Sequence, residues 1–101
     1  MPKQTGPVLV VDDDEAVRHS LKFILELEGY AVRLYADGAD LLGDGALPTN
    51  GCLVVDYWMP GLDGVQLVGR LRDRAVDLPA ILITGRSTND LRRRAKAAGF
   101  H

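Results

Sequence analysis

Near the start of the chain lies the stretch Val8-Leu9-Val10-Val11-Asp12-Asp13-Asp14, in which four apolar residues run directly into three acids. A second run of this kind, Cys52-Leu53-Val54-Val55-Asp56, occurs near the middle of the chain. Continuous apolar runs of this length, rich in Val, are typical of strands buried on both faces of a parallel sheet that helices cover. These two stretches therefore predict an α/β fold.

Three acids at the ends of these runs are candidates for a functional site. A carboxylate at the carboxyl end of a parallel strand points into the crevice where open α/β sheets bind ligands. If Asp12, Asp13 and Asp56 converge there, their charges repel one another, and a cation is expected among them. The sequence thus predicts a small acidic metal site.

Strands and helices are expected to alternate along the whole chain. The apolar runs predict strands over residues 8–12, 30–35, 52–56 and 79–84. Apolar residues spaced for helices predict four of them: from about residue 15 to Gly29, from Asp37 to residue 42, after Asp63 through Leu71, and from residue 87 or 89 to 98. Acids at their starts, Asp13 or Asp14, Asp37 and Asp63, are placed to cap the first three helices. This order predicts an open parallel sheet with helices on both faces.

Composition and charge narrow the class of protein. A chain of 101 residues suits one domain, and a net charge of −2 gives no general attraction to nucleic acid or to anionic membranes. The single cysteine, Cys52, excludes an internal disulfide, and its apolar strand predicts a buried thiol. No apolar stretch approaches the length of a membrane span or forms the core of a signal peptide, so we expect a cytoplasmic protein that does not bind membranes. From the net charge we also expect no direct binding to nucleic acid.

The chain resembles the receiver domain of two-component response regulators. The resemblance runs from Val8 to Phe100 and is carried by three motifs in order. They are the acidic segment Val10-Val11-Asp12-Asp13-Asp14, the segment from Val54 to Gly64 that contains Asp56-Tyr57-Trp58-Met59-Pro60-Gly61, and Ile81-Leu82-Ile83-Thr84-Gly85.

This resemblance implies a flavodoxin-like (CheY-like) sheet with strand order 2-1-3-4-5 and a specific site. By analogy, Asp56 accepts a phosphoryl group from a sensor histidine kinase. Asp12, Asp13, Asp56 and the backbone carbonyl of Trp58 then hold Mg²⁺, and the Thr84 hydroxyl bonds the new phosphate and switches the interaction surface. Such a module is not an enzyme beyond catalysing its own phosphorylation and dephosphorylation.

The sequence departs from the family's pattern at its end. The family continues with a fifth strand that ends in Lys-Pro and a fifth helix, whereas this chain ends at His101, and Lys3, Lys22 and Lys96 cannot supply that lysine. We therefore expect a receiver domain over residues 1–101 that is truncated at its C-terminal end and carries no output domain. The strand over residues 79–84 should then be an exposed edge, open to a homodimer or to exchange of a segment with another chain.

Two other functions fit part of the pattern. A degenerate receiver that serves only as an interaction or dimerisation module is favoured by the missing lysine and opposed by the intact acids. A Mg²⁺-dependent phosphohydrolase with an aspartyl-phosphate intermediate would share the nucleophile. Such enzymes usually carry a second acid two residues later, where this chain has Trp58.

Overall fold

The structure, a computed structural model, describes residues 6–83 as alternating strands and helices. The elements in chain order are β1 (Val8–Val11), α1 (Glu15–Leu27), β2 (Val32–Tyr35), α2 (Gly38–Leu42), β3 (Cys52–Asp56), α3 (Gly64–Asp73) and β4 (Ala80–Ile83). Each agrees with a predicted element to within two residues at the boundaries that were specified. The predicted helix over residues 87–98 lies outside the described residues.

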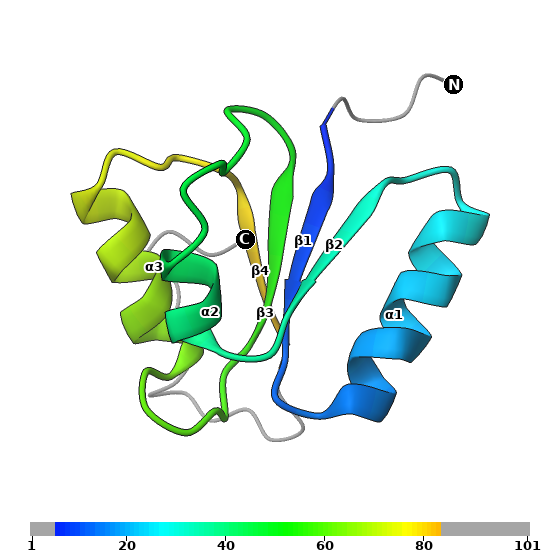
Figure 1. Cartoon of the computed structure of the whole chain (residues 1–101), viewed down its shortest axis with the longest axis horizontal. Helices are drawn as coiled ribbons and strands as arrows, with labels where there is room; N and C mark the ends of the chain where they lie inside the picture. The colour runs from blue at the N-terminus through cyan, green and yellow to red at the C-terminus, as the bar shows by residue number, and fades with distance from the viewer. Residues whose placement is uncertain (1–5, 84–101) are drawn as a thin grey trace.

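The four strands form one parallel sheet in the order β2-β1-β3-β4 (Figure 1). Val10 of β1 lies between Leu34 of β2 and Val54 of β3, and Val54 in turn lies beside Ile81 of β4. The predicted order is therefore confirmed for these four strands. Since the chain moves outward from β1 to β2 and then crosses to β3, the boundary between β1 and β3 is the switch point of the sheet.

Helices cover the two faces of the sheet unequally. Figure 1 shows α2 and α3 on one face and α1 on the other. The buried apolar core lies between the sheet and the pair α2 and α3, which we call the closed face. Its fully buried members include Leu9, Val11, Leu53, Val55, Leu41, Leu67, Val68, Leu71 and Ala80.

Among residues 6–83, the helix that covers the opposite face is α1, which packs on β1 and β2, and we call this side the open face. Burial falls across its matched positions, from fully buried Val10 to half-buried Val54 and then to Ile81, which is 48% exposed. The prediction of strands buried on both faces thus holds for β1 and is wrong for β3, whose side chains are alternately buried and half-buried. The cause is that α1 packs on β1 and β2, at one side of the sheet.

The helix caps follow the sequence prediction. Asp14, Asp37 and Asp63 each accept hydrogen bonds from backbone N–H groups in the first turn of α1, α2 and α3. Asp63 and Gln66 form a reciprocal capping box, in which each side chain bonds the other residue's backbone N–H. These acids are explained by capping, whereas the acids at the strand ends, Asp12, Asp13 and Asp56, are not helix caps.

The ends of α1 and α3 have the same backbone geometry with different residues. After α1, Gly29 has a φ of 94°, and its N–H bonds the Glu26 carbonyl while that of Tyr30 bonds the Leu25 carbonyl. After α3, Ala75 takes the corresponding position with a φ of 59°. Both ends are Schellman motifs, and only the first has the glycine that this left-handed conformation favours.

Two observations concern the single cysteine and the membrane. Cys52 is half-buried at the start of β3, less than the full burial predicted, and this burial raises the pKa of its thiol. Among residues 6–83 there is no helix with the length and apolar character that a membrane crossing requires.

Candidate metal and phosphoryl-acceptor site

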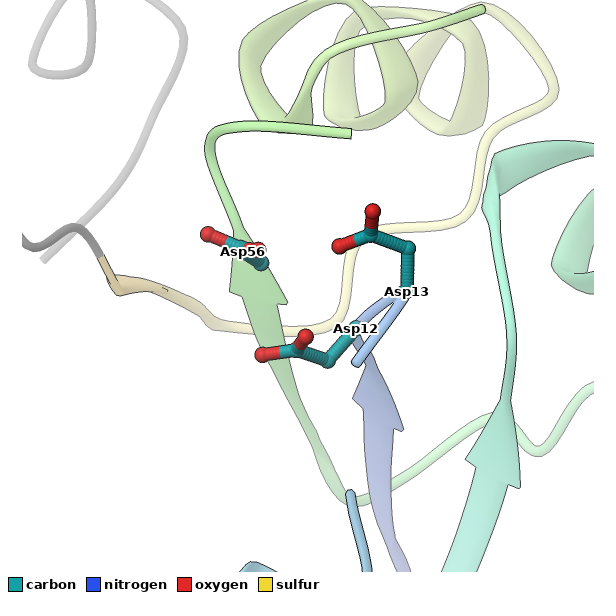
Figure 2. Close-up of side chains that lie close together, drawn as sticks. All are labelled: Asp12, Asp13 and Asp56. Atoms are coloured by element: carbon teal, nitrogen blue, oxygen red, sulfur yellow. The ribbon is translucent and has the colours of Figure 1, made fainter. Parts of the chain in front are cut away.

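The three acids predicted to converge do so at the carboxyl end of the sheet. Asp12 and Asp13 directly follow β1, Asp56 is the last residue of β3, and these strands are neighbours. One carboxylate oxygen from each of the three side chains lies within 4.8 Å of the other two. Figure 2 shows the three carboxylates around one small space. The convergence predicted from the strand ends is therefore confirmed.

The three carboxylates differ in their exposure to solvent. Asp12 is buried, with 4% of its surface exposed, Asp56 is half-buried, and Asp13 is exposed. The cluster therefore has a buried base at Asp12 and opens to solvent beside Asp13. A small ion or the end of a substrate can approach from that side without any rearrangement of the core.

Burial and mutual repulsion both act on the Asp12 carboxyl. Burial raises its pKa most, and the charges of Asp13 and Asp14 raise it further. Two interactions oppose this rise: the backbone N–H of Asp14 donates to Asp12 Oδ1 at 2.9 Å, and the positive charge of Arg18 favours the ionised form. The net effect of these interactions is to raise the pKa of Asp12 above its ordinary value.

The Asp56 carboxyl experiences the same two effects. Burial raises its pKa, and the neighbouring charge of Asp12 raises it further, while the backbone N–H of Trp58 donates to Asp56 Oδ1 at 3.2 Å and lowers it. A divalent cation among the three acids would relieve this repulsion. Hard carboxylate oxygens with an opening for water are the donors that Mg²⁺ prefers, so the residues present could hold such an ion.

A network of hydrogen bonds holds the turn that carries Asp12 and Asp13. The Asp14 carboxylate accepts from the N–H groups of Ala16 and Val17, which anchors the turn to the start of α1. From the next turn of α1, the Arg18 guanidinium donates to the backbone carbonyl of Asp12 at 2.7 Å. Arg18 was not among the site residues predicted from the sequence. Its spacing, six residues after Asp12 and within the first turns of the helix, is the signal that would have found it.

The backbone of α3 at Gly64 lies close to the backbone of Asp56. At Gly64, the first residue of α3, an added Cβ would lie 2.7 Å from the Asp56 carbonyl oxygen and 3.0 Å from a methyl group of Leu82. The Gly64 N–H also donates to the Tyr57 carbonyl at 3.1 Å. Because Gly64 has no side chain, α3 can pack directly against the end of β3.

Two predicted site residues are less completely placed. Trp58 lies two residues after Asp56 and is 58% exposed, and its indole packs edge-on against the Tyr57 ring with centroids 4.5 Å apart. Its role as a carbonyl ligand stays a prediction. Thr84 lies outside the described residues, so the expected contact of its hydroxyl with a phosphoryl group also stays a prediction.

The chain is similar to response regulators in sequence. The model of the family described as response regulator receiver domain matches residues 8–101. The transcriptional regulatory protein FixJ of Azorhizobium caulinodans is 43% identical over 79 residues, which are 78% of this chain and 37% of that protein. The chain thus spans little more than a third of the length of this curated relative.

Solved structures agree with the fold. A crystal structure named FixJ-N is 37% identical and superposes with a TM-score of 0.87, covering 97% of this chain and 78% of that one. The response regulator TrrA of Thermotoga maritima, solved in complex with Mg²⁺–BeF, is 28% identical with a TM-score of 0.79, over 92% of this chain and 81% of that one. The expected strand order and CheY-like architecture therefore have direct structural counterparts.

Proposed function

Because this chain belongs to the receiver-domain family of response regulators, we propose that it accepts a phosphoryl group on Asp56 from a sensor histidine kinase, with Mg²⁺ bound beside it. The observation that carries the proposal is the convergence of Asp12, Asp13 and Asp56 within 4.8 Å at the switch point of the sheet. TrrA was solved with Mg²⁺–BeF, which supports Mg²⁺ as the ion in a related fold. The proposal concerns the receiver region alone.

Asp56 is suited to be the nucleophile because a carboxylate needs no base to attack phosphorus. An Asp56 carboxylate oxygen forms a bond to the phosphorus atom, the bond from phosphorus to the donor's histidine nitrogen breaks, and the imidazole leaves with its electron pair. The Asp56 carboxylate is half-buried and lies close to that of the exposed Asp13. The backbone N–H of Trp58 holds one of its two oxygens and thereby orients the carboxylate.

The ion would be held by Asp12, Asp13, Asp56 and the backbone carbonyl of Trp58. When bound, Mg²⁺ offsets the negative charge that develops on the transferred phosphoryl group. Thr84 would then donate its hydroxyl to the aspartyl phosphate, and the helix predicted after it, with the loop before that helix, would follow and change the interaction surface.

The test is the intact mass of the protein after incubation with acetyl phosphate, with and without Mg²⁺. We expect one phosphoryl adduct in wild type, and none in Asp56→Asn or when EDTA removes the metal. Asp77→Asn is the matched control, because Asp77 is an exposed acid in the loop before β4, at the other end of the sheet. It should accept the phosphoryl group as wild type does.

The other outcomes would contradict the assigned acceptor or indicate a different function. An adduct that persists in Asp56→Asn would contradict the assigned acceptor. A folded chain that binds Mg²⁺ and forms no adduct would be an interaction module, and continuous release of phosphate over many turnovers would indicate a phosphohydrolase.

A further inference from the structure

Arg18 connects helix α1 to the turn that carries Asp12 and Asp13, and the proposed phosphoryl transfer assigns this residue no role. Its guanidinium donates to the Asp12 carbonyl oxygen at 2.7 Å, and its own backbone N–H donates to the Asp14 carbonyl at 3.0 Å. The first contact is partly buried, where a charged hydrogen bond is stronger than at an exposed surface. Arg18 therefore joins the end of β1 to the second turn of α1.

Electrostatic repulsion between carboxylates acts to spread the turn that Arg18 holds. It carries three consecutive acids, and the side chains of Asp12 and Asp13 face a third carboxylate, that of Asp56. The hydrogen bond from the Asp14 N–H holds the Asp12 side chain, while the Asp12 carbonyl accepts its hydrogen bond from a group outside the turn. Arg18 supplies that group, and it brings a positive charge to the same place.

We propose that Arg18 is a positioning residue for the metal site. It holds the backbone of Asp12 so that the carboxylates of Asp12 and Asp13 stay within reach of Asp56. This inference rests on the proposed function, since it assigns Arg18 a part in Mg²⁺ binding. Arg18 acts through the Asp12 carbonyl and touches neither the ion nor the phosphoryl group.

A second role for the same contact would change Mg²⁺ binding in the opposite direction. If Arg18 acted only as a counter-charge for the acids, its removal would leave the site more negative and Mg²⁺ would bind more tightly. If Arg18 positions the acids, its removal loosens the turn and Mg²⁺ binds more weakly. The sign of the change in affinity therefore separates the two roles.

The experiment is a calorimetric Mg²⁺ titration of wild type, Arg18→Gln, Arg18→Lys and Lys22→Gln. Lys22 lies one turn further along the same side of α1, so Lys22→Gln removes the same charge without touching Asp12. We expect Arg18→Gln to weaken Mg²⁺ binding by about tenfold, the scale found for groups that orient metal ligands. Arg18→Lys, which keeps a donor and the charge, should lose less, and Lys22→Gln should bind as wild type does.

Hydrogen exchange of the Asp14 amide in metal-free protein gives a readout that does not depend on metal. This amide should exchange faster in Arg18→Gln and unchanged in Lys22→Gln, because only the first change frees the turn. Affinity in Arg18→Gln equal to or tighter than in wild type, or an unchanged Asp14 amide, would overturn the inference. Wild type that neither binds Mg²⁺ nor accepts a phosphoryl group would instead refute the proposed function.

Discussion

The two faces of the sheet differ in packing although they share the same four strands. On the closed face, Val55 and its neighbours are sealed under α2 and α3. On the open face, α1 contributes no buried residue, and both Ile24 of that helix and Ile81 of β4 are about half exposed. Most of the hydrophobic stabilisation must therefore come from the closed face, because it scales with the apolar area removed from water.

The acids of the candidate site lie on the less densely packed side of the sheet, the open face. Side chains alternate along a strand, so Asp56 shares its face with Val54, which is the open face. Asp12 follows Val10 by two residues, and Arg18 reaches it from α1. This division leaves the closed face to hold the strands in register, while Asp56, at the end of the open face, stays partly exposed to solvent and Asp12 is buried beside it.

The largest expected effect comes from two adjacent valines on opposite faces of β3. Val55→Ala should lower the free energy of unfolding by roughly 2–3 kcal/mol, because it loses buried methyl groups and leaves a cavity. Val54→Ala removes the same atoms from a half-buried position and should cost about 1 kcal/mol or less. Urea unfolding of both variants measures the difference. Equal costs would show that the open face is as well covered as the closed one.

Two glycines of α3 test the close packing beneath Asp56. Gly64→Ala should cost roughly 1–3 kcal/mol, because its Cβ would push against the Asp56 carbonyl and the closed-face methyl groups of Val55 and Leu82. Gly69→Ala is the matched control, since its Cβ would meet nothing within 4 Å and Ala favours a helix by about 1 kcal/mol. Opposite signs in thermal unfolding are expected. A neutral Gly64→Ala would mean that α3 shifts to accept the methyl group.

The Schellman motifs that end α1 and α3 allow a comparison between the helices of the two faces. Ala75→Gly should stabilise the protein by up to about 1 kcal/mol, because it relieves a left-handed conformation at the end of α3. Gly29→Ala should destabilise it by about 1 kcal/mol through the same strain at the end of α1. Denaturant midpoints measure both changes. A loss of stability in Ala75→Gly would show that the gain in unfolded-chain entropy exceeds the strain relieved.

The smallest effect concerns the acids at the end of the open face, and it depends on pH. Because the pKa of Asp56 is raised in the fold, the folded state binds its proton more tightly than the unfolded chain does. The resulting stability is present at low pH and is lost as pH rises from about 4, the ordinary Asp pKa, through the raised value. Metal-free Asp56→Asn should therefore differ least from wild type near pH 4 and be the more stable of the two proteins at pH 7.

Urea unfolding in EDTA across this pH range measures that difference, and added Mg²⁺ gives the control. Binding of Mg²⁺ to the native site should stabilise wild type more than Asp56→Asn and reduce or reverse the gap. A difference between the proteins that does not change with pH would contradict an origin in the Asp56 charge.

Local patterns in the sequence were enough to predict the described strands and helices, the parallel α/β class and the three acids of the candidate site. Those features are local: an apolar run ended by an acid predicts both a buried strand and a carboxylate at its end. The same local signal separated Asp14, Asp37 and Asp63, which start helices, from Asp12 and Asp56, which end strands. The family's motifs supplied the order of the strands and the expected roles of the site residues.

The packing of the elements in three dimensions sets how the two faces are covered and which groups support the acids. The sequence of β3 is apolar on both sides, so it could not show that Val54 is left half-buried while Val55 is sealed. The Arg18 contact with Asp12 and the packing of Gly64 against Asp56 depend on where α1 and α3 lie against the strand ends. Such contacts join elements that are separate in the fold, and local patterns in a sequence do not specify the distances between them.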